Sequence, residues 1–192
     1  MRDNPNPQGK GLTPLLQGLD QHCLDRLLPP KQIEQVEMEL FTSMFVLQSE
    51  FRFNPVPNRT YFLYQKEGTY RLLLVGPHEW GSTLYLGRYI GSCVLHNDRT
   101  WTLDLDPAME RDLEFMTHIT SEQNKLQQVL EHADTLEDIL PVFEESFGYH
   151  GRILAFILGK SLSISMDMAG IKSLTYNEAR GLLFHNKSHE MS

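Results

Sequence analysis

The sequence predicts an α+β fold, in which a four-stranded, curved antiparallel meander is covered by a long N-terminal helix and followed by an all-α C-terminal annex. Apolar residues recur at steps of three and four from Ile33 to Phe51, which is the period of an amphipathic helix. Aromatic and aliphatic runs then alternate with turn signals over residues 61–105, a pattern typical of antiparallel strands. Asp106 and later N-cap residues precede further apolar stretches, which indicates helices.

The region before the sheet is predicted to hold an arm and two helices. Residues 1–14 are rich in proline and glycine, which oppose regular structure, so we expect a flexible or clamped arm. Residues 15–28 follow as a short helix. The long helix spans residues 31–52, because Pro30 suits a first helical turn and the residue before Pro55 avoids the α region.

The four strands are expected at residues 60–65, 70–75, 86–95 and 100–105. Gly68 is predicted to take a positive φ in the turn between the first two strands, where a left-handed residue closes a hairpin. The nearly continuous apolar run of the second strand predicts burial on both of its faces. Gly87 and Gly91, within the third strand, are expected to mark bulges or strong curvature.

The remaining chain is predicted to be helical. Asp106 is expected to cap a helix that begins at Pro107 and continues to His132. Asp134 with Glu137, and Thr175 with Glu178, have the spacing of capping boxes. These elements predict three regions, which are an arm at 1–14, a helix-plus-sheet unit at 15–106 and a helical annex at 107–192. We expect the regions to pack together as one globular unit.

Charge is distributed unevenly along the 192 residues, whose net charge is −8. From Asp104 to Glu145 there are twelve acidic residues and only two basic ones, Arg111 and Lys125. Such a surface repels phosphate backbones, so the sequence predicts no nucleic-acid partner. The acidic stretch is interpreted either as a solvated helix face or as a docking face for a basic partner.

Cysteine usage and hydropathy favour a cytoplasmic protein. Cys23 and Cys93 lie far apart and match no metal-ligand spacing, so they are interpreted as reduced thiols. The longest purely apolar run, residues 153–158, is far too short to cross a membrane. The sequence therefore predicts no membrane association, no metal and no cofactor.

Several motifs in the sheet region agree in order with a known family. They are the Tyr-rich strand at 61–64, the turn at 66–68, the Pro-x-Glu-Trp-Gly corner at 77–81, Leu-Gly-x-Tyr at 86–89 and Asp-x-Thr-Trp-Thr at 98–102. In these motifs the chain resembles a family of small uncharacterised proteins, a domain of unknown function found in bacteria and animals. The resemblance covers the first half to two-thirds of the chain. It implies a shared fold and relatedness, and no activity.

Two groups of residues are candidates for chemistry. His78 and Glu79, beside Trp80, could perform acid–base work, because an apolar neighbour raises the pKa of a carboxyl. The alternative, which we favour, is a structural corner with Trp80 in the core. Cys93 and His96 are three apart, which on one strand places them on opposite faces and disfavours a catalytic dyad.

Aromatic residues on the sheet are candidates for a ligand platform. Rings on a curved sheet can bind peptides, sugars or bases, although in a half-covered sheet most such rings belong to the core. The candidate platform residues are Tyr61, Tyr64, Tyr89, Trp80 and Trp101.

The leading functional hypothesis is a non-enzymatic binding or adaptor module that acts through protein–protein contacts. The alternative is a small enzyme with a pocket between the sheet and the helical annex, using His78 and Glu79. The segment from Ile153 to Met168 is more apolar than a surface helix. Because an annex of this size can hardly cover it from within, it predicts a homodimer interface, and the alternative is that the second face of the sheet covers it.

Overall fold

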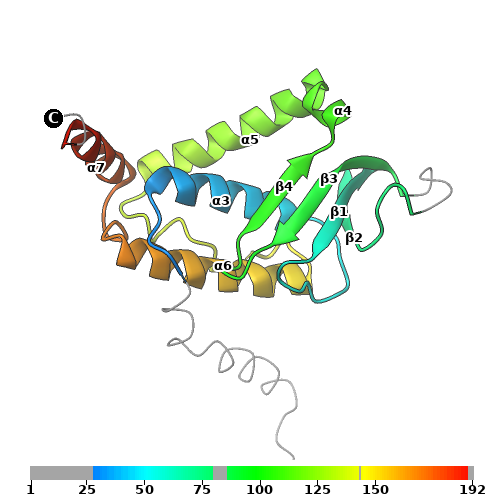
Figure 1. The fold of residues 1–192 in the computed structure, drawn as a ribbon, viewed down its shortest axis with the longest axis horizontal. Helices are drawn as coiled ribbons and strands as arrows, with labels where there is room; N and C mark the ends of the chain where they lie inside the picture. Colours follow the sequence, from blue (N-terminus) through cyan, green and yellow to red (C-terminus); the bar gives the residue numbers. More distant parts are fainter. Residues whose placement is uncertain (1–27, 80–85, 143, 190–192) are drawn as a thin grey trace, which may run out of the picture.

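The computed structural model describes residues 28–79, 86–142 and 144–189, with the side chains of 183–189 excepted. Its helices are α3 (Ile33–Leu47), α4 (Pro107–Glu110), α5 (Leu113–His132), α6 (Tyr149–Met168) and α7 (Tyr176–His189). Its strands are β1 (Thr60–Lys66), β2 (Thr69–Leu73), β3 (Arg88–Leu95) and β4 (Trp101–Leu105). The α+β class and the four-stranded antiparallel sheet are thus confirmed, with helices following the sheet (Figure 1).

The strand order differs from the predicted meander. It is β2-β1-β3-β4, so β1 pairs with both β2 and β3, and β2 lies at an edge. The link from β2 to β3 must therefore cross β1. The described start of this link, residues 74–79, passes over the face of the sheet turned away from the helices, where Gly76 lies against the ring of Phe62 and the Tyr64 hydroxyl donates to the Val75 carbonyl at 3.1 Å.

The position of β2 also corrects its predicted burial. Leu72 is buried on the helix-covered face, but Leu73 is half-buried and Leu74 is 42% exposed. An edge strand with one covered face needs only one apolar row, so the apolar run does not signal burial on both faces.

Glycine positions predicted from the sequence are confirmed at the first hairpin and at the bulge. Gly68 has φ 78° and follows Glu67 at φ 51°, which closes a two-residue turn. The pairing of β1 with β3 shifts between Leu63 and Tyr64, beside Gly91. A Cβ on Gly91 would lie 2.2 Å from the Asp104 carbonyl oxygen, so only glycine fits between these strands.

Helix α3 ends at Leu47, five residues earlier than predicted. Glu50 leaves the helix to pair with the open edge of β2, donating its N–H to the Tyr70 carbonyl at 2.8 Å and accepting from the Leu72 N–H at 3.1 Å. Unpaired backbone groups at a partly buried sheet edge are costly, so this non-local pairing competes with continuation of the helix.

The predicted helix at 107–132 is divided in two. Asp106 caps α4 as expected, accepting from the Ala108 N–H at 2.8 Å. The side chain of Asp112 then accepts from the Phe115 N–H at 2.8 Å and starts α5. The Thr175–Glu178 capping box forms, but Asp134 starts no helix, because the side chain of Asp138 accepts from Thr135 and holds this segment in turns.

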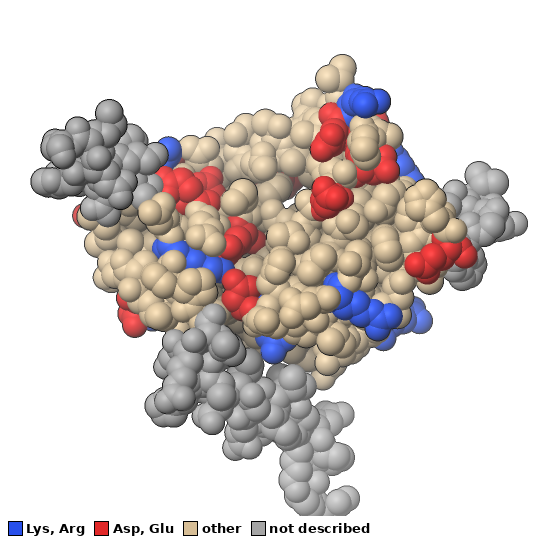
Figure 2. Space-filling view, viewed as in Figure 1, with Lys and Arg blue, Asp and Glu red and all other residues tan. Residues whose placement is uncertain are grey.

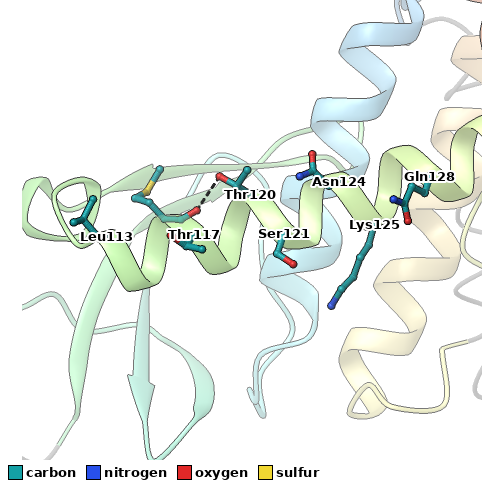
Figure 3. Close-up of a pocket in the computed structure, with 8 residues that line it drawn as sticks. Leu113, Thr117, Thr120, Ser121, Asn124, Lys125 and Gln128 are labelled. Carbon is teal, nitrogen blue, oxygen red and sulfur yellow. Dashed lines mark hydrogen bonds between the residues drawn. The ribbon is translucent and has the colours of Figure 1, made fainter.

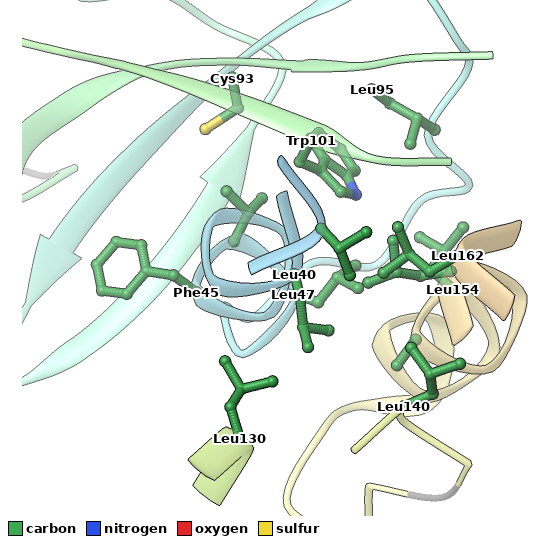
Figure 4. Close-up of a cluster of buried hydrophobic side chains, with 14 of the residues drawn as sticks. Leu40, Phe45, Leu47, Cys93, Leu95, Trp101, Leu130, Leu140, Leu154 and Leu162 are labelled. Carbon is green, nitrogen blue, oxygen red and sulfur yellow. The ribbon is translucent and has the colours of Figure 1, made fainter. Parts of the chain in front are cut away.

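A single core joins the sheet to all the helices around α3. Leu40, Phe45 and Leu47 project from α3 in different directions (Figure 4). The helix lies between Trp101 and Cys93 of the sheet on one side and helices α5 and α6 on the others. Residues from both 15–106 and 107–192 therefore pack in one cluster, which reaches from Ile33 to Ala179.

The same packing covers the apolar segment for which a homodimer interface was predicted. Leu154, Leu158 and Leu162 of α6 are at most 6% exposed within a single chain, with Leu154 and Leu162 near α3 (Figure 4). Helix α3, which belongs to the helix-plus-sheet unit and not to the annex, packs against α6 and covers these residues. The apolar character of residues 153–168 does not by itself require a second subunit.

Substitution of two unobstructed glycines should shift stability in opposite directions. Neither Gly68 nor Gly181 has an atom within 4 Å of an added Cβ. We expect Gly68→Ala to lower the free energy of unfolding by about 1 kcal/mol, because its φ is left-handed. Gly181→Ala, within α7, should raise it by about 0.5–1 kcal/mol through helix propensity. Urea unfolding measures both, and equal shifts would contradict this account.

Candidate functional site

Two of the predicted platform aromatics lie in the core. Tyr61 and Trp101 are each 1% exposed, on the face of the sheet that α3 covers, with their rings 5.7 Å apart in an edge-to-face arrangement. The Tyr61 hydroxyl accepts a hydrogen bond from the Val56 N–H at 2.6 Å. The platform prediction was wrong for these two residues, because α3 seals this face.

The opposite face holds Tyr64 and Tyr89, whose rings lie 5.3 Å apart. Tyr64 is fully buried because the crossing link from β2 packs over it, and Tyr89 is half-buried. Burial raises the pKa of both hydroxyls above their usual value. Tyr64 therefore offers no free ring to a ligand, and Trp80 lies outside the described residues.

His78 and Glu79 are exposed on the link between β2 and β3. The Glu79 N–H donates to the Gly76 carbonyl at 3.2 Å, which forms a turn. Neither residue lines any of the three hollows described below. The structure thus places this pair on an open turn, away from the junction of sheet and helices.

Cys93 and His96 point to opposite faces of the sheet, as predicted, although His96 lies one residue beyond the end of β3. Cys93 is fully buried in the core, and burial raises the pKa of its thiol to about 12. The His96 Nε2 atom lies 3.1 Å from the hydroxyl of Thr102, on the other face. The two side chains form no dyad.

A buried lysine connects three segments of the chain. The Lys31 side chain is 1% exposed, and its Nζ lies 2.5 Å from Glu39 and 2.6 Å from Asp98. The Thr100 hydroxyl donates to the second oxygen of Asp98 at 2.7 Å, and the Ser161 hydroxyl donates to the Asp98 carbonyl. This cluster holds the β3–β4 turn against α3 and α6. Every charge in it has a partner, so we interpret it as structural.

Two of the three hollows are lined mainly by polar and charged side chains. A hollow of about 510 Å³ is lined only by α5 residues, which follow one another along a single helix face (Figure 3). That face includes Leu113, which is 84% exposed, and the Thr120 hydroxyl, which donates to the Met116 carbonyl at 2.9 Å. A second hollow of about 510 Å³, beside α6, is lined by Ile164, Met168 and five polar or charged residues, two of which, Lys172 and Glu137, form an ion pair of 3.0 Å.

The third hollow, which we call the α3–α5 groove, is enclosed by three segments. Its volume is about 360 Å³, within the range of ligand pockets. Its walls are formed by Leu40, Phe41, Met44, Phe45 and Gln48 of α3, by Glu122, Lys125, Leu126 and Val129 of α5, and by Ile139, Pro141, Glu144 and Phe147 of the link to α6.

Apolar side chains in the α3–α5 groove remain open to solvent. Phe41, Met44, Leu126 and Phe147 are half-buried, and Val129 is 57% exposed. The Phe41 and Phe45 rings stack with their centroids 6.3 Å apart. Partly exposed apolar residues gathered in one hollow are typical of a binding site. The groove is the candidate functional site, and no motif in the sequence predicted it.

Groups suited to hold a metal ion are absent from the part of the chain that the structure describes. Within the same residues, none of the helices combines the length and hydropathy that a membrane crossing requires. On the face shown in Figure 2, acidic and basic side chains are interspersed.

Comparison with known proteins identifies one partial relative. The chain is similar to the uncharacterized protein C08B11.9 of Caenorhabditis elegans, with 36% identity over 77 residues. The match covers 39% of this chain and only 37% of the relative's length. No family model matches the chain, and no solved structure matches it. The relative's name states no activity, so the match supports relatedness over that part alone.

Asp98 should make stability depend on pH. Burial raises the pKa of its carboxyl, but hydrogen bonds from Lys31 and Thr100 outweigh this and hold the pKa below its ordinary value. The stabilisation is therefore complete above about pH 5 and is lost as the pH falls through the folded-state pKa. We expect Asp98→Asn to cost about 2 kcal/mol at pH 7, and less at pH 3. Urea unfolding at both values measures this, and a constant difference would contradict it.

Cys93 should be inert in the folded protein. With a thiol pKa of about 12, roughly one thiol in ten thousand is ionised at pH 8, and the thiolate is the reactive form. In a Cys23→Ser background, we expect DTNB to react with Cys93 only after guanidinium unfolds the chain. Equal reaction rates with and without denaturant would show that Cys93 is accessible.

Proposed function

We propose that this protein is a non-enzymatic binding module that acts through protein–protein contacts, and that its binding site is the α3–α5 groove. The observation that supports this most strongly is the row of partly exposed apolar side chains, from Phe41 and Met44 on one helix to Val129 on the other. Leaving such side chains open lowers stability, and a partner that covers them regains the lost burial.

The arrangement of polar groups supports binding over catalysis. The charged groups that line the groove are Glu122, Lys125 and Glu144, and Lys125 is paired with Glu122 at 2.6 Å. An acid–base enzyme built on His78 and Glu79 would require a hollow beside those residues, whereas both lie on an exposed turn.

The proposal places the protein in the cytoplasm, with a free thiol at Cys93, and without a nucleic-acid partner. It also includes relatedness to the uncharacterised family that shares the motifs at 61–64 and 77–81.

Site-specific photo-cross-linking tests the proposal. A benzoylphenylalanine at position 129 would lie at the groove, and one at position 113 would lie outside it on the same helix; the replaced residues, Val129 and Leu113, are 57% and 84% exposed. In native cytosol we expect discrete protein adducts from position 129. We expect the same adducts to be missing when the probe is at position 113. Identical adducts from both positions, or no adduct from position 129, would exclude the groove as a protein-binding site.

A further inference from the structure

The partner of the α3–α5 groove can be described by its chemistry, and this inference rests on the proposed function. From the walls and charges of the groove, we infer that it binds a basic amphipathic helix, which inserts apolar side chains between α3 and α5 and places lysine or arginine residues at the rim.

The helical walls of the α3–α5 groove favour a helical partner. Helices α3 and α5 contact each other and form two walls of the groove. The backbone groups inside a helix are already hydrogen-bonded, so the two helical walls offer few backbone donors or acceptors to an extended peptide. A helical partner satisfies its own backbone and presents side chains at steps of three and four. A groove of about 360 Å³ accommodates a few such side chains rather than a whole helix.

The wall residues suit side chains of varied shape. Met44 and Phe41 line one side of the groove, and Leu126 and Val129 line the other. Methionine is unbranched and adapts to the surface it meets, and the spacing of Phe41 and Phe45 follows one helix face. These residues recognise aliphatic or aromatic side chains and no particular polar group.

The sign of the partner's charge follows from the rim. Lys125 is neutralised by Glu122, while Glu144 has no ion pair recorded among the described residues. From Leu126 to Gly151 the sequence contains no lysine or arginine, but it contains six acidic residues, which are Glu131, Asp134, Glu137, Asp138, Glu144 and Glu145. A basic partner is therefore attracted to this rim and an acidic one is repelled.

Three synthetic peptides of equal length test the inference. All carry leucines on one helix face, and the other face carries lysine, glutamine or glutamate. We expect fluorescence anisotropy to rank their affinities in the order lysine, glutamine, glutamate, with the preference for lysine decreasing as salt is added. Equal affinity of the lysine and glutamine peptides would overturn the basic partner while leaving the groove as a binding site.

Two matched pairs of variants locate the site. Met44→Gln removes an apolar wall group and should weaken the lysine peptide by about tenfold, whereas Met38→Gln, at a residue 64% exposed on the same helix and outside the groove lining, should not. Glu144→Gln should weaken it by about threefold, and Glu145→Gln by less. Equal effects within both pairs would overturn the groove as the binding site of the peptide.

The outcomes separate this inference from the proposed function. If position 129 forms protein adducts in cytosol but none of the three peptides binds, the helical partner is wrong and the binding module remains. If neither adducts nor peptide binding is found, both proposals fail. Circular dichroism of the bound lysine peptide should show helix, and an unchanged coil spectrum would also overturn the helical partner.

Discussion

The burial of α3 is the constraint on which the rest of the structure depends. Leu40, Val46 and Leu47 are at most 2% exposed, and each fully buried side chain of this kind contributes about 1.5–3 kcal/mol. The sheet, α5, α6 and α7 all pack against this one helix. Its apolar surface therefore determines that the helical annex folds onto the sheet unit as part of one core, rather than forming a separate domain.

Local patterns in the sequence predicted local structure well. The stripe that begins at Ile33 formed a helix, and Gly68 took its positive φ. Non-local pairing was not predictable in the same way. The end of α3 at Leu47 depends on Glu50 pairing with β2, and the strand order depends on a link that crosses β1. The sequence pattern of one segment does not indicate which distant segment it will contact. These contacts are stabilised by satisfying backbone groups that lie far apart in the sequence.

Candidate sites were harder to predict for a related reason. An aromatic residue on a strand has the same pattern whether its face is sealed, as for Trp101, or crossed by a loop, as for Tyr64. The α3–α5 groove is assembled from three segments, so no short motif describes it. One local signal existed, since Phe41 and Phe45 widen the apolar stripe of α3 beyond what the sheet alone can cover.

The weak attachment of α5 connects the groove to stability. Within this helix of 20 residues, the buried ones are Phe115, Ile119 and Leu130, so little apolar area holds it against α3. An element with few buried contacts opens at a lower free energy than the core does. A ligand between α3 and α5 would add contacts to both helices, and binding to the folded state alone stabilises that state. Binding in the groove and the packing of α5 against α3 are therefore coupled. The free energy of binding adds to the stability of the packed helix, and a well-packed α5 strengthens binding.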